Sequence, residues 1–230
     1  MRIRITIIIV LVLTASFSIV NAQDSLTVIE HLSYSLLFNE KYKVPSVVSW
    51  DLSSKDLGRY SKGQHINFKE DPATRRPRVS TASYRNTGYH RGHLCPAGDR
   101  GSTIEKWRDT FYMSNVAPMQ PRLNTGAWKA AEDECRAMAS TGCDLRITAI
   151  PLWLDSIAPD FGNPPVKVPS HFYKCAQCFT HPGHVIHWLF RNTQERQDMQ
   201  KCVITPNKAK AILQGSRTGI YKSKSNSQCE

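Results

Sequence analysis

Acidic residues are scarce in this 230-residue sequence, which has 19 Asp and Glu against 30 Lys and Arg and a formal net charge of +11. After residue 22 it has no apolar run of the roughly 20 residues that a membrane span needs. It also has no internal repeat and no long linker. What is left is a single basic domain, whose charge predicts anionic partners such as nucleic acid, anionic glycans or lipid surfaces.

The only long apolar run lies at the amino terminus, over residues 5–13, after a short basic start. The small residues Val20 and Ala22 occupy positions −3 and −1 of a signal-peptidase cleavage site before Gln23. The pattern predicts a signal peptide over residues 1–22 and a secreted or periplasmic domain over residues 23–230. The run is short for a membrane anchor, and no cysteine follows the cut as a lipoprotein would require. We therefore expect no membrane association of the mature form.

All seven cysteines lie in the mature part. In an oxidising compartment most of them should pair, and because seven is odd at least one stays free. One cluster of cysteines and histidines has a regular spacing of two intervening residues: Cys175, Cys178, His181 and His184. It could be either a four-ligand zinc site or a disulfide-bearing loop with solvated histidines.

The order of predicted elements indicates an α+β domain with a central antiparallel sheet, flanking helices and long loops. Residues 32–39 and 45–52 read as a hairpin, and residues 53–86 as a long polar surface loop. Later strands are predicted over residues 146–154, 171–175, 184–192 and 201–205, followed by a short helix over residues 207–215.

A clearer helix is predicted over residues 124–142, where apolar residues recur at helical spacing: Trp128, Ala131, Cys135 and Met138. Asn124 or Thr125 would cap its start and Gly142 would close its end. A second stripe on this helix has a spacing of four and carries polar chemistry: Asn124, Trp128, Glu132 and Arg136. A helix with only a structural role would usually make such a stripe either apolar or fully solvated.

The segment TGYHRGHLCPAGDR, residues 87–100, combines groups suited to phosphodiester chemistry. Histidine accepts and returns a proton near neutral pH, and arginine binds phosphate oxygens through paired donors. Glycine lets the backbone approach a bulky group closely. With the carboxamide oxygen of Asn124 as a ligand for a hydrated Mg²⁺, these groups suggest metal-assisted attack on a phosphodiester.

Three motifs in order resemble the DNA/RNA non-specific endonucleases of the ββα-metal, or His-Me finger, class. They are YHRGHLCPAGDR, FYMSNVAPMQPRLNTGAW and EDECR. The resemblance is close over residues 89–136 and looser over most of the mature chain. It implies the ββα-metal fold, with His93 near the end of a strand and Asn124 near the start of a helix.

The resemblance also implies a role for each matching residue. His93 resembles the general base that activates water, and Asn124 resembles the only direct protein ligand of the metal, Mg²⁺ or a substituting Mn²⁺. Glu132 resembles the helix carboxylate that holds metal-bound water. Asn115 resembles the amide that orients the base or the substrate. Arg91 and Arg136 resemble the basic residues that lie near the scissile phosphate.

Two positions depart from the family pattern. His90 stands where the family usually has Asp, which puts the rate in doubt more than the type of reaction. An arginine usually found just before the segment NFKEDP has no clear counterpart, since His65 and Ile66 stand there. Substrate phosphate contacts are therefore expected from the basic segment that follows, at Arg75, Arg76 or Arg78.

The resemblance implies an endonuclease that hydrolyses DNA and RNA without sequence preference and leaves 5′-phosphate ends. A second hypothesis is a catalytically weakened nucleic-acid-binding or surface protein on a nuclease scaffold, which the two departures favour. Joint retention of His93, Asn124 and Glu132 favours the enzyme. A third, an exported phosphatase, lacks the usual set of several carboxylate and histidine ligands.

Overall fold

The computed structural model describes residues 25–58, 60, 66–155, 159–181 and 183–217. The predicted signal peptide, His65 and Cys229 lie outside these residues. Within them, no helix combines the length and the apolar character that crossing a membrane would require.

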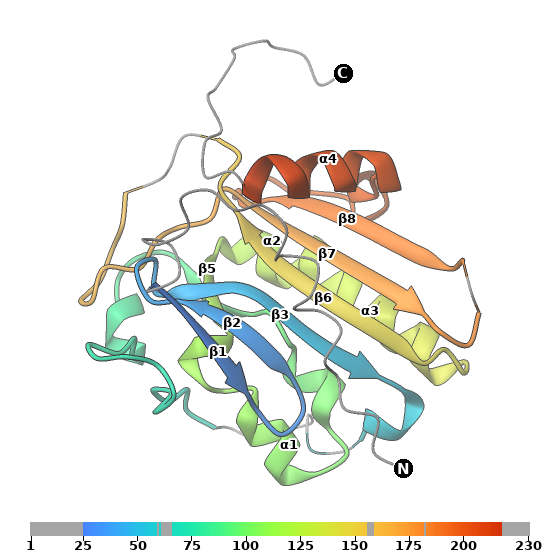
Figure 1. Cartoon of the computed structure of the whole chain (residues 1–230), viewed down its shortest axis with the longest axis horizontal. Coiled ribbons are helices and arrows are strands. Elements are labelled where there is room, and N and C mark those ends of the chain that lie inside the picture. Colours follow the sequence, from blue (N-terminus) through green and yellow to red (C-terminus); the bar gives the residue numbers. More distant parts are fainter. Residues whose placement is uncertain (1–24, 59, 61–65, 156–158, 182, 218–230) are drawn as a thin grey trace, which may run out of the picture.

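A six-stranded antiparallel sheet forms the centre of the fold, in the order β1-β2-β3-β6-β7-β8 (Figure 1). The α+β class predicted from the sequence is confirmed, as is the early hairpin, whereas strand β1 was not predicted. The strand bounds are β1 Leu26–Glu30, β2 Ser35–Asn39, β3 Val44–Leu52, β6 Leu145–Leu152, β7 His171–Cys178 and β8 Val185–Arg191.

Strands β3 and β6 are neighbours in the sheet, yet the chain between them runs from residue 53 to residue 144. This single insertion carries every element of the predicted site. Its elements are β4 His90–His93, α1 Ile104–Asp109, β5 Val116–Met119, α2 Pro121–Thr125 and α3 Ala127–Ser140. The site is therefore built on one long excursion from a continuous sheet.

Alternate residues of the sheet strands serve two separate cores, because successive side chains of a strand point to opposite faces. Phe172 of β7 belongs to the main core, together with Trp128 of α3. The next residue, Tyr173, belongs to a smaller core with Ala209 of α4 (Pro206–Arg217). Helices α3 and α4 thus cover opposite faces of the sheet, as Figure 1 shows.

The predicted strand over residues 201–205 is wrong. A 3-10 turn occupies Gln200–Cys202, and Val203 forms only an isolated bridge with Trp188. Thr205 directly precedes α4, and its carbonyl oxygen accepts a hydrogen bond from the Ala209 N–H of that helix. Too few residues remain between the turn and the helix to extend the sheet.

The helix predicted over residues 124–142 is two helices, α2 and α3, separated at Gly126. Gly126 has φ −107° and ψ −112°, and a Cβ there would lie 2.4 Å from the Arg122 carbonyl oxygen. Asn124 lies inside α2 and does not cap α3, which corrects the predicted helix start. The predicted end is confirmed, because Gly142 adopts φ +103° directly after the last turn of α3.

The cysteines pair less than the sequence led us to expect. Among the described residues one disulfide forms, between Cys143 and Cys178, while four cysteines are free: Cys95, Cys135, Cys175 and Cys202. Cys95 and Cys135 are buried in the main core. There they act as small apolar side chains, and the expectation that most cysteines pair is wrong for this part of the chain.

Strands β4 and β5 form a separate two-stranded antiparallel ribbon, in which Gly92 pairs with Ala117. A Cβ on Gly92 would lie 2.7 Å from the Met119 Cβ, closer than side chains tolerate. Glycine therefore lets Met119 fill the space beneath the strand that ends at His93.

We predict that Gly92→Ala destabilises the protein, because the added methyl group forces Met119 or the strand to move. Overpacking of this kind costs about 1–3 kcal/mol. The free energy of unfolding from urea titration measures the loss, and an unchanged value would show that the ribbon adjusts without strain.

Candidate active site

His93 is the last residue of β4, and its ring packs against two phenylalanines that also contact each other. The ring centroids of Phe68 and Phe111 are 4.8 Å and 5.1 Å away. The His93 carbonyl oxygen accepts a hydrogen bond from the indole nitrogen of Trp128, 3.2 Å away, which ties the strand end to α3. Backbone and ring are thus both fixed.

The His93 imidazole is held in the neutral state. Burial, helped by the nearby Arg91 guanidinium, lowers the pKa of His93 to about 4. Its Nε2 is buried and has no hydrogen-bond partner among the described residues. Such unpartnered buried atoms are uncommon in proteins. A neutral imidazole nitrogen with no internal partner is suited to accept a proton from an incoming group.

Asn115 fixes the chain where it leaves β4. Its side-chain oxygen accepts from the Cys95 N–H at 2.9 Å, and its nitrogen donates to the Cys95 carbonyl at 2.8 Å and to the Thr110 carbonyl at 2.9 Å. The side chain is fully buried. Of the two roles that the resemblance implied for Asn115, this placement favours orienting the base over contacting the substrate.

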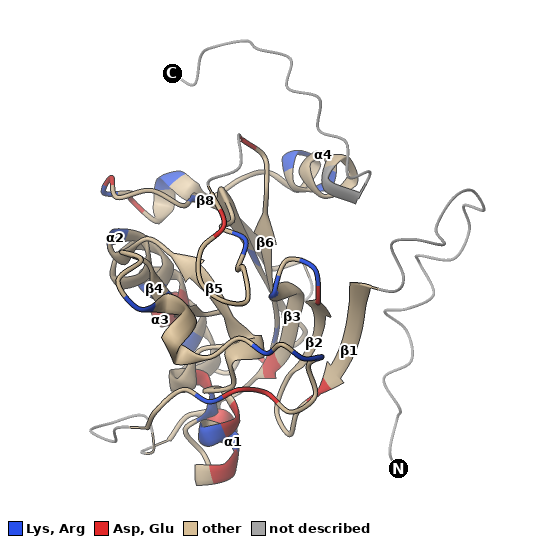
Figure 2. Ribbon diagram, turned by 90° about the vertical axis from the view of Figure 1, so that its left-hand side faces the viewer, with Lys and Arg blue, Asp and Glu red and all other residues tan. Residues whose placement is uncertain are grey.

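Asn124 and His90 meet at the rim of an open pocket. The Asn124 Nδ2 lies 3.3 Å from the His90 Nδ1. Arg91 is also at the pocket, with its guanidinium carbon 4.9 Å from the centroid of the Phe68 ring. Phe68 lines the pocket and also contacts His93, although His93 itself is not among the residues that line it. The neighbouring β4 and α2 carry basic residues, drawn in blue in Figure 2.

Glu132 and Arg136 lie one turn apart on α3, facing the chain that follows β4. Burial raises the pKa of Glu132 to about 7, although the ammonium group of Lys174 acts in the opposite direction. Arg136 donates to Asp99 at 2.8 Å and also pairs with Asp133. Its guanidinium is therefore engaged within the protein, and a Cβ on Gly98 would lie only 2.9 Å from it.

The structure does not bring Arg75 and Arg76 to the pocket. Both are exposed on the loop before the 3-10 turn Thr81–Tyr84, and neither lines it. Arg85 lines it instead, together with Tyr84 and Tyr89, none of which was predicted as a site residue. Tyr89 begins the quoted motif YHRGHLCPAGDR, whereas Tyr84 and Arg85 lie in residues 53–86, which show no periodicity, and their only signal was nearness in sequence to that motif.

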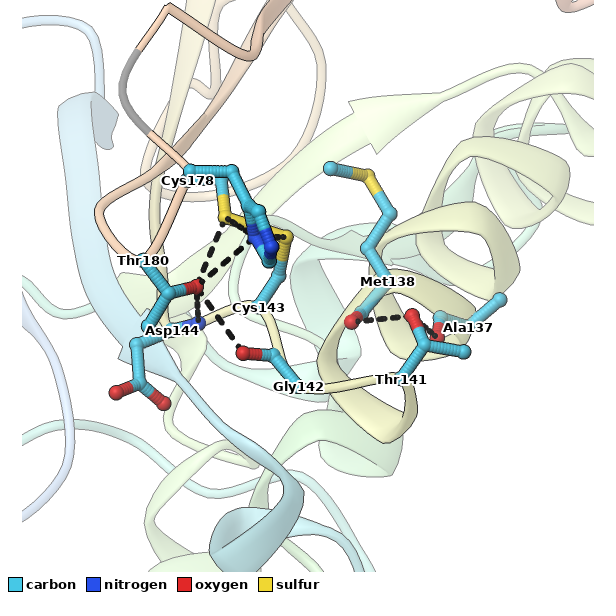
Figure 3. Close-up of a disulfide and its surroundings, with 9 residues drawn as sticks. Ala137, Met138, Thr141, Gly142, Cys143, Asp144, Cys178 and Thr180 are labelled. Atoms are coloured by element: carbon cyan, nitrogen blue, oxygen red, sulfur yellow. Dashed lines mark hydrogen bonds between the residues drawn. A yellow bond between two sulfur atoms is a disulfide. The ribbon is translucent and has the colours of Figure 1, made fainter.

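The four-ligand zinc alternative is wrong. Cys178 is bonded to Cys143, at the carboxyl end of α3 (Figure 3), whereas Cys175 packs against the smaller core on the other face of the sheet. Among the described residues, one group of three potential metal ligands lies close together: Cys143, Cys178 and His181. Two of these are the sulfurs of the disulfide.

Comparison with known proteins agrees with this geometry. The model of the DNA/RNA non-specific endonuclease family matches residues 14–216. A nuclease from Nostoc sp. is 32% identical over 166 residues, which cover 70% of this chain and 58% of that protein. Mitochondrial endonuclease G from Bos taurus is 31% identical over 152 residues, covering 62% of this chain and 51% of that protein.

A solved structure, the crystal structure of the EndoG/EndoGI complex, superposes with a TM-score of 0.70 over 80% of this chain and 82% of that one. At 24% identity it shows a common fold. The chain belongs to the DNA/RNA non-specific endonuclease family. The matched region spans about half the length of the curated relatives, 58% and 51% of the two proteins above.

We predict stability losses of very different size for two asparagines of the site. Asn115→Ala removes three hydrogen bonds and leaves the backbone groups of Cys95 buried without partners, at about 1–3 kcal/mol for each unsatisfied group. Asn124→Ala removes one long contact at a half-buried position and should change stability by less than about 0.5 kcal/mol. Urea unfolding of both variants gives the comparison, and equal losses would contradict the structural role of Asn115.

Proposed function

We propose that this protein is a metal-dependent endonuclease that hydrolyses phosphodiester bonds of DNA and RNA without sequence preference. The observation that carries the proposal is the neutral His93, held at the end of β4 with an unpartnered Nε2 beside Arg91. Family membership supports it, as do the names of the relatives.

In this proposal the Nε2 of His93 takes a proton from water, and the water oxygen attacks phosphorus. The bond from phosphorus to the 3′ oxygen breaks, and the leaving oxygen takes a proton from solvent, which gives a 5′-phosphate and a 3′-hydroxyl. Arg91 is exposed on β4 and binds the oxygens of the attacked phosphate. Asn115 and Trp128 keep the strand end in place through their contacts to the Cys95 backbone and the His93 carbonyl.

The residues present fit a hydrated Mg²⁺, for which Mn²⁺ would substitute. The contact to His90 uses the Asn124 nitrogen and leaves its carbonyl oxygen, a hard ligand of the kind Mg²⁺ prefers. Glu132 would accept hydrogen bonds from the water shell of the cation. When bound, the cation stabilises the negative charge that develops on the phosphate. With one neutral ligand, we expect cation and substrate to bind synergistically.

Contacts to phosphates would dominate substrate binding, because the chain is basic and carries no recognised base-reading motif. Backbone contacts carry little sequence information and weaken steeply with salt. We further propose that the protein is exported through its signal peptide. The amino-terminal sequence of the protein purified from outside the cytoplasm tests this, with residue 23 as the expected start.

The rival function is nucleic-acid binding without cleavage, suggested by His90 in place of the usual Asp. The contact between His90 and Asn124 gives His90 a positioning role at the metal ligand. EDTA-sensitive cutting of plasmid DNA separates the two functions, since the rival predicts binding with no cutting.

We predict that His93→Ala lowers the cutting rate by about 10²–10⁴-fold, the usual contribution of a general base, while nucleic-acid binding persists. His90→Ala should lower it only about two- to tenfold, because one long hydrogen bond is lost. Turnover on plasmid DNA and binding are measured for both at saturating Mg²⁺. A folded His90→Ala protein as inactive as His93→Ala would reverse the assigned roles.

The pH dependence should follow Glu132. With a pKa of about 4, His93 is neutral and able to act as a base throughout the mildly acidic range, whereas Glu132, with a pKa of about 7, loses its charge there. We therefore predict that kcat/KM of the wild type falls as the pH drops through about 7. Glu132→Gln should have a lower plateau and an acid limb displaced toward about 4. An acid limb left in place by Glu132→Gln would mean that another group controls it.

A further inference from the structure

The pocket beside His93 extends well beyond the residues assigned to the reaction. Its lining joins the end of β4 and the rim of α2 to the loop that precedes β4: Phe68, Thr81, Tyr84, Arg85, Tyr89, His90, Arg91 and Asn124. The mechanism above uses only Arg91 and Asn124, with His90 as a support. The part formed by Tyr84, Arg85 and Tyr89, which we call the Tyr84 subsite, has no assigned role.

The Tyr84 hydroxyl is the distinctive feature of this subsite. Tyr84 is 6% exposed, and its hydroxyl is buried without a hydrogen-bond partner among the described residues. Phe161 holds the ring in place, edge-on at a centroid distance of 5.2 Å. Leaving a buried hydroxyl unpaired costs stability, so a ligand that supplies the missing partner is favoured there.

The hydroxyl is available as a donor at every working pH. Burial raises the pKa of Tyr84 well above its ordinary value, while the Arg91 guanidinium acts in the opposite direction. The phenol therefore keeps its proton and offers it to an acceptor. An anionic oxygen is the acceptor with which such a donor makes its strongest hydrogen bond.

The charges around the hydroxyl select an anion. Arg85 and Arg91 are both exposed at the pocket, and no Asp or Glu is among its lining residues. The aromatic rings already have faces in contact with protein groups, since Tyr89 stacks on Phe161 at 5.5 Å and Phe68 lies under Arg91. What the Tyr84 subsite offers to a ligand is thus a hydroxyl and guanidinium groups.

We propose that the Tyr84 subsite binds the phosphate group next to the scissile one, with Tyr84 donating its hydroxyl hydrogen and Arg85 supplying the charge. This rests on the proposed nuclease function. The Arg91 charge acts on both the Tyr84 hydroxyl and the His93 ring, so in this proposal Arg91 contacts both phosphates. The subsite then sets the register of the strand, because fixing a neighbouring phosphate places the attacked one beside His93.

Tyr84→Phe is the sharpest test, because it removes one oxygen atom and keeps the ring. The expected result is a fall in kcat/KM on a short oligonucleotide of about tenfold to a hundredfold, the range for a hydrogen bond to a charged group. Tyr34→Phe is the matched control, because the buried Tyr34 hydroxyl donates to the Asp109 carbonyl at 2.8 Å, outside the pocket. Its kcat/KM should not change. An unchanged value for Tyr84→Phe would overturn the proposal.

The source of the effect is settled with modified substrates. A neutral methylphosphonate is placed at the phosphate that neighbours the scissile phosphate. It should reduce cutting by the wild type, and should reduce cutting by Tyr84→Phe much less. An abasic nucleotide at the same place removes a base and keeps the phosphate charge. If the abasic change, and not the methylphosphonate, reduces cutting by the wild type much more than by Tyr84→Phe, the subsite binds a base and the proposal is wrong. Arg85→Ala should weaken binding and reduce its salt dependence, whereas Arg108→Ala, an equal loss of charge on α1, should do neither.

The test separates failure of the subsite from failure of the nuclease function. If the wild type binds the oligonucleotide and does not cut it, the nuclease function fails. The subsite is then tested by the dissociation constants of wild type and Tyr84→Phe, which should differ by the same factor. If the wild type neither binds nor cuts, both proposals fall.

Discussion

The buried carboxylate of Asp99 is the constraint on which the geometry of the site depends. Asp99 is 1% exposed, and it accepts hydrogen bonds from the Trp50 indole of β3 at 2.9 Å and from Arg136 of α3 at 2.8 Å. A charge taken out of water is costly unless it is paired and hydrogen-bonded. The turn after β4, the central sheet and α3 must therefore come together at one point. Glu132 lies on α3, and His93 ends the strand that leads into this turn, so the same requirement helps to position both.

Lys174 extends this arrangement into the sheet. Its side chain is 1% exposed on β7, with the ammonium nitrogen 4.0 Å from the centroid of the Trp128 ring. Together with Arg136 it supplies the positive charge that faces Asp99 and Glu132. Burial alone would favour the uncharged form of Glu132, and the Lys174 charge opposes that shift. The cluster that fastens α3 to the sheet thus also helps to set the ionisation of Glu132.

The sequence predicted the elements whose pattern is local and missed those that depend on distant partners. Trp128, Ala131 and Cys135 are buried as their helical spacing indicated, and Gly142 ends the helix as expected. Strand β4 has no alternating pattern, because its glycine is set by the close approach of Met119 from another strand, so only the family resemblance predicted a strand ending near His93. The break at Gly126 could not be read either, since it is a backbone bend within an otherwise helical pattern.

The candidate site shows the same division. The motifs identified His93, Asn124 and Glu132, because residue type and spacing along the sequence are enough to recognise them. Tyr84 and Arg85 lie in a stretch without periodicity, and they become part of the pocket only because the insertion between β3 and β6 folds back on itself. Val79 and Tyr84 anchor that stretch in the main core, so the segment expected to be a surface loop has buried contacts of its own. A loop anchored in this way presents Arg85 to the pocket at a fixed position, which a solvated loop would not do. The wall of the pocket that Tyr84 and Arg85 form is therefore built by long-range packing, while the residues of the proposed reaction are encoded by short motifs.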